Sequence, residues 1–111
     1  MPWPGTEHSW HSRRVPTSRS VQPRIAKRAT SFEPQVAAAF GSVVRAERLK
    51  REIAQDEFAL LANIDRSYFG KLERGVRQPS LALILRVAGG LGVSASALMA
   101  KVERELVSQA A

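Results

Sequence analysis

The chain has 111 residues, of which 44% are hydrophobic and 24% charged, and its formal net charge is +7. That length suits one small domain, and the composition is too apolar for a chain that is disordered throughout. The absence of cysteine excludes disulfides, thiolate metal sites and cysteine nucleophiles. No apolar run approaches the ~18 residues of a membrane span, and the N-terminus lacks the apolar stretch of a signal peptide. We therefore expect a cytoplasmic protein with polyanionic partners such as nucleic acid or acidic lipid.

The first 33 residues differ in composition from the rest of the chain. They hold six basic residues against two acidic ones, four of the six prolines, and no helical or alternating apolar pattern. Such a segment buries too little apolar surface to offset its ordering entropy, so residues 1–33 are predicted to be a disordered basic arm. Two interpretations remain open: an arm that follows DNA phosphates or enters a minor groove, and a solvated tail.

From Pro34 onward the apolar spacing becomes helical. Proline suits the first position of a helix, and this helix is predicted to run to Arg51. Its apolar side consists of Val36, Phe40, Val43, Val44 and Ala46. Its second half is basic, complements the helix dipole and is interpreted as a solvated face, formed by Arg45, Arg48, Lys50 and Arg51. An alternative places Arg45 beside a carboxylate of the second helix, Asp56 or Glu57.

A second helix is predicted over residues 55–62, with an inward face of Phe58, Ala59, Leu61 and Ala62. Asn63 follows, and asparagine accepts the left-handed conformation that ends a helix in a sharp turn. Ile64 is placed to fill this turn. Asp65 is expected to cap the next helix by accepting a hydrogen bond from its first free N–H groups.

The third helix is predicted over residues 66–74, closed by Gly75 in the left-handed conformation. Phe69 and Leu72 face inward, and the outward residues are Arg66, Ser67, Lys71 and Arg74. A fourth helix, capped by Ser80, is expected to bury Leu81, Ile84, Leu85, Ala88 and Leu91. A fifth, capped by Ser94, is predicted to reach about Ser108. The fold class is therefore all-α, a compact five-helix domain spanning residues 34–111.

The stretch QDEFALLANIDRSYFGKLERG, residues 55–75, is the informative feature. Two short helices joined by a tight turn describe a helix-turn-helix, which holds its second helix out from the body of the domain. A helix fits the major groove of B-DNA, where residues near its N-terminus reach base edges. From the spacing alone, an αα-hairpin that has no binding function is the alternative.

These residues resemble the lambda-repressor/Cro-like helix-turn-helix family, also called the xenobiotic-response-element (XRE) family. The resemblance covers Phe40 to Leu98 and includes Phe40-Gly41, Phe58-Ala59, DRSYF (65–69), LERGVRQPSL (72–81) and LGVSASAL (91–98). Four positions depart from the family pattern: Glu52 replaces a common glycine, Ala54 a capping Ser or Thr, and Asn63 the usual turn glycine, while Gly70 lies inside the third helix. For Gly70, both a close backbone approach and simple tolerance are considered.

The resemblance implies a role for each outward residue of the motif. Arg66 and Ser67 are expected to contact base edges, and Lys71, one turn later, to touch base or backbone. Phosphate contacts are expected from Gln55, Tyr68, Arg74 and Arg77. For Tyr68, packing beside the fourth helix is the alternative. Glu73 would repel the DNA backbone and is expected to pair with Arg77 or another nearby arginine.

Family members usually bind near-palindromic operators as two-fold dimers, so we expect double-stranded DNA as partner and a homodimer. On the fifth helix, Leu98, Val102 and Leu106, with Met99 and Val107 beside them, form either the dimer interface or a cap on the core. The expected function is that of a small transcriptional regulator.

An alternative class is an antitoxin or accessory module whose main partner is another protein. No catalytic residues, metal ligands or cofactors are predicted: the two histidines, His8 and His11, lie in the arm without evident partners. An enzyme is therefore not expected. A membrane-surface peptide is not expected either, because the arm lacks an amphipathic face.

Overall fold

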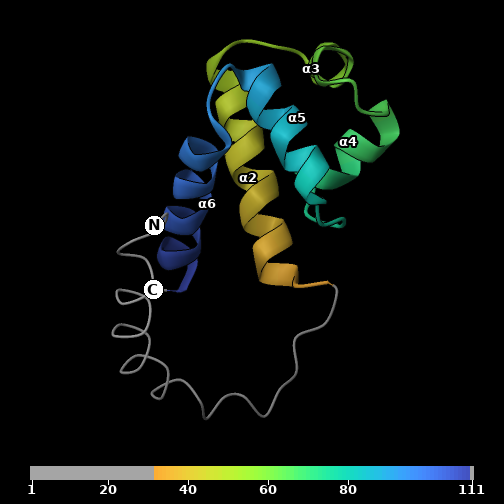
Figure 1. The fold of residues 1–111 in the computed structure, drawn as a ribbon. Helices are drawn as coiled ribbons and strands as arrows, with labels where there is room; N and C mark the ends of the chain where they lie inside the picture. Colours follow the sequence, from red (N-terminus) through yellow and green to blue (C-terminus); the bar gives the residue numbers. More distant parts are fainter. Residues whose placement is uncertain (1–31, 111) are drawn as a thin grey trace, which may run out of the picture. The chain divides into compact units, whose positions relative to one another are not determined.

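The computed structural model describes residues 32–110, which form helices and no strand (Figure 1). The helices are α2 (Pro34–Lys50), α3 (Gln55–Ala62), α4 (Arg66–Glu73), α5 (Leu81–Leu91) and α6 (Ala95–Ala110). The predicted all-α class and all five predicted helices are confirmed, with ends that shift by one or two residues. The predicted arm lies outside the described residues, except for Phe32 and Glu33.

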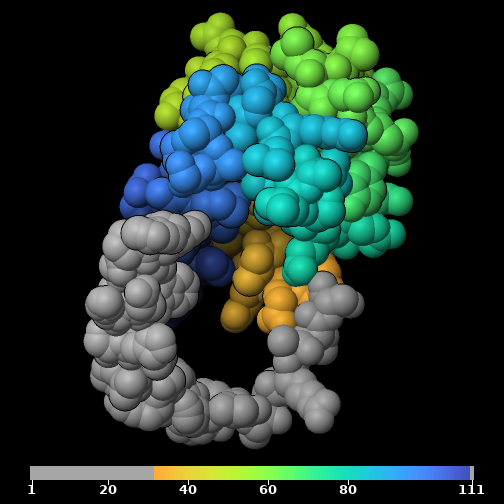
Figure 2. Space-filling model, in the orientation of Figure 1, coloured from red at the N-terminus to blue at the C-terminus, as the bar shows by residue number. Residues whose placement is uncertain are grey.

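Helix α2 is the central element of the domain. It packs against α4, α5 and α6, and α3 contacts both α4 and α5. Figure 1 shows α6 on one side of α2 and the α3–α4 pair on the other. The same arrangement appears in the space-filling view, where α3 and α4 form one rim of the molecule (Figure 2). Of the two helices of the predicted motif, α4 therefore packs directly on α2, whereas α3 is held by α4 and α5.

The core is built from the apolar face that each helix turns toward its neighbours. Its largest fully buried side chains are Phe58, Phe69, Leu72, Leu98, Val44 and Val87. The rings of Phe58 and Phe69 have centroids 5.1 Å apart and a tilted geometry. Such an aromatic pair contributes about 0.5–1.5 kcal/mol beyond its buried area. This contact joins α3 to α4, so the angle between them is set by packing as well as by the turn.

Several apolar residues predicted to be buried are exposed instead. On α5, Leu81 is 72% exposed and Leu85 is 55% exposed. The buried stripe of this helix runs through Val87, Ala88 and Leu91, and the two leucines lie outside it. On α3, Leu61 is 60% exposed, because a helix of eight residues packs only the face of Phe58, Ala59 and Ala62. On α2, Val36 and Ala46 are also exposed.

The apolar residues of α6 pack mainly into this domain's own core. Leu98 and Val102 are buried, Met99 and Leu106 are partly buried against the core, and Val107 is exposed. This burial favours the core-cap interpretation of the stripe over the dimer interface. Among the described residues no single helix is long and apolar enough to span a membrane, and α5 and α6 reach that length only together, across a bend of 103°.

Two residues mark how the backbone of α2 meets its neighbours: Glu52, by its left-handed conformation, and Gly41, by a close helix contact. Glu52, where the family commonly has glycine, adopts a positive φ of 57° in the turn before α3. Gly41 on α2 faces the backbone of α4: a Cβ there would lie 2.5 Å from the carbonyl oxygen of Leu72 and 2.6 Å from that of Glu73. The two helices therefore approach as closely as a glycine permits.

Candidate nucleic-acid interface

The turn between α3 and α4 has the geometry that the sequence predicts. Asn63 is left-handed, with φ 58° and ψ 51°, and Ile64 is buried behind it. The Asp65 carboxylate accepts a hydrogen bond from the Tyr68 N–H at 3.0 Å. An asparagine at the turn and an N-cap aspartate thus end one helix and start the next within three residues.

Helix α4 divides into a buried and an outward face. Phe69, Gly70, Leu72 and Glu73 are buried. Arg66, Ser67 and Arg74 are exposed and Lys71 is half-buried. Arg77 is exposed in the loop that follows. The structure therefore brings together, on one rim, the basic residues and the serine that the sequence places at base edges and phosphates.

The Arg66 side chain reaches back to α3. Its Nη1 lies 3.1 Å from Oδ2 of Asp56, and both side chains are about two-thirds exposed, at 69% and 66%. The partner of Asp56 is therefore Arg66 and not Arg45. The contact spans the two helices of the motif.

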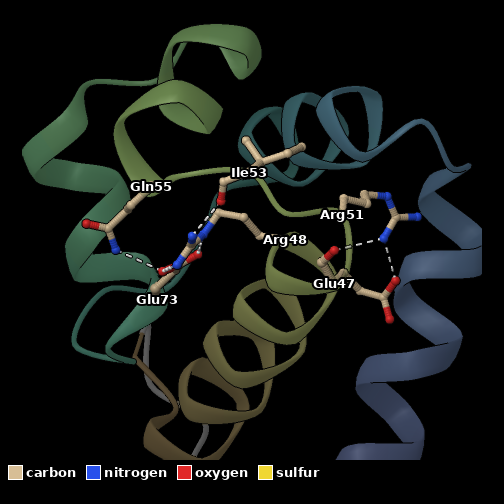
Figure 3. A network of polar contacts seen from close by, with 6 residues as sticks. All are labelled: Glu47, Arg48, Arg51, Ile53, Gln55 and Glu73. Carbon is tan, nitrogen blue, oxygen red and sulfur yellow. Dashed lines mark hydrogen bonds and ion pairs between the residues drawn. The ribbon is translucent and has the colours of Figure 1, made fainter.

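Glu73 pairs with an arginine, as expected, and that arginine is Arg48 of α2. Its carboxylate accepts two hydrogen bonds from Arg48, from Nε at 2.7 Å and from Nη2 at 2.9 Å (Figure 3). The side chains are only 6% and 2% exposed. Of the two expected possibilities, Arg77 or another arginine, the second is confirmed: Arg77 donates to the carbonyl of Val76 instead. The assignment of Arg48 to a solvated face is wrong.

The buried pair has further partners that join three helices. Arg48 Nη1 donates to the carbonyl of Ile53 at 2.8 Å, and Gln55 Nε2 donates to Glu73 Oε1 at 2.8 Å. The hydrogen bonds that Arg48 donates to the Glu73 carboxylate raise the pKa of its guanidinium above the ordinary value. The network fixes α4 to α2 and sets the orientation of Gln55 at the start of α3. Gln55 uses one of its two amide N–H groups in this bond.

The sequence holds one signal for this network. Glu73 follows Phe69 by four residues, which places it on the buried face of α4. An acid on a buried face requires a cation. Nothing local identifies which of the basic residues of α2 supplies it, because Arg48 and Glu73 are 25 positions apart.

A second ion-pair cluster lies where α2 approaches α6. Arg51 Nη1 lies 2.8 Å from Glu47 Oε1, and Lys50 and Lys101 lie within 3.6 Å of the same carboxylate. The hydrogen bond from Arg51 lowers the pKa of Glu47. Arg51 Nε also donates to the Leu91 carbonyl at 3.0 Å. Arg51 thus ties α2 to the end of α5, whereas Lys50 and Arg45 are exposed as predicted.

For Tyr68 and Gly70, the sequence left two roles open, and the structure bears on both. Tyr68 is partly buried and packs against the core, which favours its packing role. A Cβ at Gly70 would meet only Arg74 Nη1 at 3.5 Å and Gln55 Oε1 at 3.6 Å, which are ordinary contact distances. Packing within the domain therefore does not require a glycine at this position. Among residues 32–110, no three histidine, cysteine, aspartate or glutamate side chains group as metal ligands.

Comparison with known proteins places this geometry in a family. A helix-turn-helix family model matches residues 44–98. The control protein C.MunI of Mycoplasma sp. is 34% identical over 56 residues, which cover 50% of this chain and 76% of that protein. The chain belongs to the lambda-repressor/Cro-like (XRE) helix-turn-helix family.

Other members of the helix-turn-helix family show the same likeness. The immunity repressor protein of Bacillus phage phi105 is 39% identical over 59 residues, covering 53% of this chain and 41% of the repressor. The crystal structure of the clp gene regulator ClgR from Corynebacterium glutamicum has a TM-score of 0.65 and 27% identity, covering 70% of this chain and 83% of ClgR. All three relatives are regulators by name. In this helix-turn-helix protein, α3 and α4 are the two helices of the motif.

Proposed function

We propose that the chain is a small transcription regulator that binds a specific sequence of double-stranded DNA by placing α4 in the major groove. Family membership supports DNA binding and transcription regulation. The observation that carries the proposal is the outward face of α4, which begins at a tight turn and leaves Arg66 and Ser67 exposed in its first turn. The N-terminal residues of such a helix are the ones that reach base edges.

The side chains on this face suit base readout. Arginine bonds bidentately to O6 and N7 of guanine, and serine both donates and accepts hydrogen bonds. Lys71, one turn after Ser67, extends the same face. We assign base contacts to these residues: Arg66, Ser67 and Lys71.

Phosphate contacts would fix the position of α4 in the groove without reading sequence. We assign them to Gln55 at the start of α3, to Arg74 at the end of α4 and to Arg77 of the following loop. Tyr68 of α4 is assigned a phosphate contact through its hydroxyl, with its ring packed against the core. Gln55 is oriented by Glu73, and Ala54 leaves the start of α3 without a side-chain cap. The amide and the uncapped N–H groups can therefore bond the same phosphate.

A homodimer is part of the proposal, because one helix reads too few base pairs for high specificity. The surface that suits a second copy is the outer side of α5, where Leu81 and Leu85 stand one turn apart and exposed. Leu98 and Val102 of α6 are used within the domain. A two-fold contact through α5 would bury the exposed leucines of both copies.

The proposed activity is binding without catalysis. The relatives are named as regulators, which supports a non-enzymatic role. We place the protein in the cytoplasm, where bacterial regulators and phage repressors meet DNA.

Replacing Arg66 with alanine is expected to cost about 1–3 kcal/mol of binding free energy on the preferred sequence and to relax base preference at one position. The fold should be unaffected, because an exposed ion pair contributes at most about 1 kcal/mol. Titration against duplexes carrying each of the four bases at that position measures both effects. Arg104→Ala, exposed on α6 across α2 from α4, is the matched control. Equal base preference in the Arg66 variant and the wild type would contradict the assignment.

The basic arm is proposed to contact phosphates beside the site of α4. Its residues Arg13, Arg14, Arg19, Arg24, Lys27 and Arg28 lie outside the described residues. The point where it joins the domain is described: the Glu33 N–H donates to Gln78 Oε1 at 2.7 Å. Gln78 lies in the loop that carries Arg77, so the arm begins next to a proposed phosphate contact.

Deleting residues 1–30 is therefore expected to weaken binding to all duplexes and to flatten its salt dependence. The slope of log affinity against log salt is negative, and its magnitude decreases by about 0.9 for every phosphate that the protein no longer neutralises. Binding titrations from low to moderate salt measure the slope, and a variant with the six basic residues changed to glutamine controls for the shortened chain. An unchanged slope would make the arm a solvated tail.

A further inference from the structure

We propose that Asp56 is a specificity-determining residue that positions the Arg66 guanidinium for base readout. This inference rests on the proposed DNA-binding function and adds a residue that touches no base. It is drawn from the contact between Arg66 Nη1 and Asp56 Oδ2 at 3.1 Å, which crosses from α4 to α3.

The contact uses one corner of the guanidinium and leaves the rest free. A guanidinium has five N–H donors in a planar fork, and the contact to Asp56 is made by Nη1. Donors on the other edge remain available for O6 and N7 of a guanine. An arginine side chain that is held in one orientation loses less conformational freedom when it binds, so the correct base gains affinity.

The exposure of the pair separates this role from a role in folding. Both side chains are about two-thirds exposed, and exposed pairs of this kind add little to stability. The ion pair whose disruption would destabilise the domain is instead the buried one between Arg48 and Glu73, because loss of either partner leaves an unpaired buried charge. That pair also engages Gln55, the residue before Asp56, so the amide of Gln55 is directed to Glu73. Because Gln55 is turned toward Glu73, the α3 side chain that contacts Arg66 is Asp56.

The carboxylate also discriminates by repulsion. A negative charge at the edge of the interface disfavours every duplex through the phosphates. The correct base offsets this cost because it engages an arginine that is already oriented. Repulsion from Asp56 weakens binding to every sequence, whereas the oriented arginine strengthens binding only to the correct one. The difference in binding free energy between the two, which is the specificity, therefore rises.

The test is random-duplex selection, followed by titration of the selected sequence and its single-base variants, for the wild type, Asp56→Asn and Glu57→Gln. Glu57 is the matched control because it is the neighbouring exposed acid on the same turn of α3. Both variants remove one negative charge, so both should bind non-specific duplex more tightly. Only Asp56→Asn should lower the preference at the position that Arg66→Ala relaxes, by roughly three- to tenfold, a part of what one bidentate contact supplies.

Two results would overturn the inference: an unchanged preference in Asp56→Asn, or an equal loss in Glu57→Gln, which would indicate a general charge effect. The proposed function fails separately, and the inference with it, if the wild type selects no sequence. Thermal unfolding of each variant shows whether the domain remains folded.

Discussion

Replacing Glu73 with alanine is expected to lower the free energy of unfolding by about 3–5 kcal/mol, because it leaves the buried Arg48 guanidinium without its charge partner. Arg48 is bonded to both carboxylate oxygens of Glu73, and the two side chains are 6% and 2% exposed. The same change releases the amide of Gln55. Urea unfolding followed by circular dichroism measures the loss. For a domain of this size, it is a large part of the total stability.

The matched control removes both charges at once. A double variant, Arg48→Met with Glu73→Leu, leaves no unpaired ion and should recover much of the stability that Glu73→Ala loses. A double variant that is less stable than Glu73→Ala would contradict this account of the pair. Recovered stability without recovered DNA affinity would indicate that the network also orients Gln55.

Changing Gly41 to alanine is expected to destabilise the domain by about 1–3 kcal/mol or more, because the added methyl group forces an overpacked contact. The new carbon would lie 2.5 Å from the Leu72 carbonyl oxygen and 2.6 Å from that of Glu73. Both atoms belong to the backbone, so the clash is relieved only when α2 and α4 move apart.

The comparison variant is Gly89→Ala on α5, where a Cβ meets nothing within 4 Å. This substitution should stabilise the domain by about 0.5–1 kcal/mol, as expected for glycine in a helix interior. Urea unfolding of the two variants therefore should give changes of opposite sign. Equal stability of Gly41→Ala and the wild type would show that α2 and α4 do not depend on this close approach.

Much of the fold can be predicted from local signals. Asn63, Asp65, Gly75 and Ser80 act on neighbouring backbone groups, so the helix ends near them follow from the residues themselves. The burial of α5 could not be predicted as well. Leu81 and Leu85 share helical spacing with residues of the buried stripe, and periodicity does not show how wide a face the neighbouring helices cover.

In the candidate site too, some features follow from the local sequence and others depend on contacts between distant residues. The outward face of α4 follows from the inward spacing of Phe69 and Leu72, so Arg66 and Ser67 could be placed from the sequence. The bond between Arg48 and Glu73 could not, because it joins helices that are distant in the chain. The contact of Arg66 with Asp56 could not be predicted for a related reason. It depends on the angle between α3 and α4, to which the packing of Phe58 on Phe69 contributes along with the turn.

The measurement that tests the account most directly is methylation interference on the sequence that the wild-type protein selects from random duplexes. Methylation of guanine N7 blocks a major-groove acceptor that Arg66 is proposed to use. The account predicts that methylated guanines are depleted from the bound DNA at positions related by two-fold symmetry, and that Arg66→Ala abolishes the depletion at one position in each half. Bound DNA that tolerates N7 methylation throughout the selected sequence would contradict the placement of α4 in the major groove.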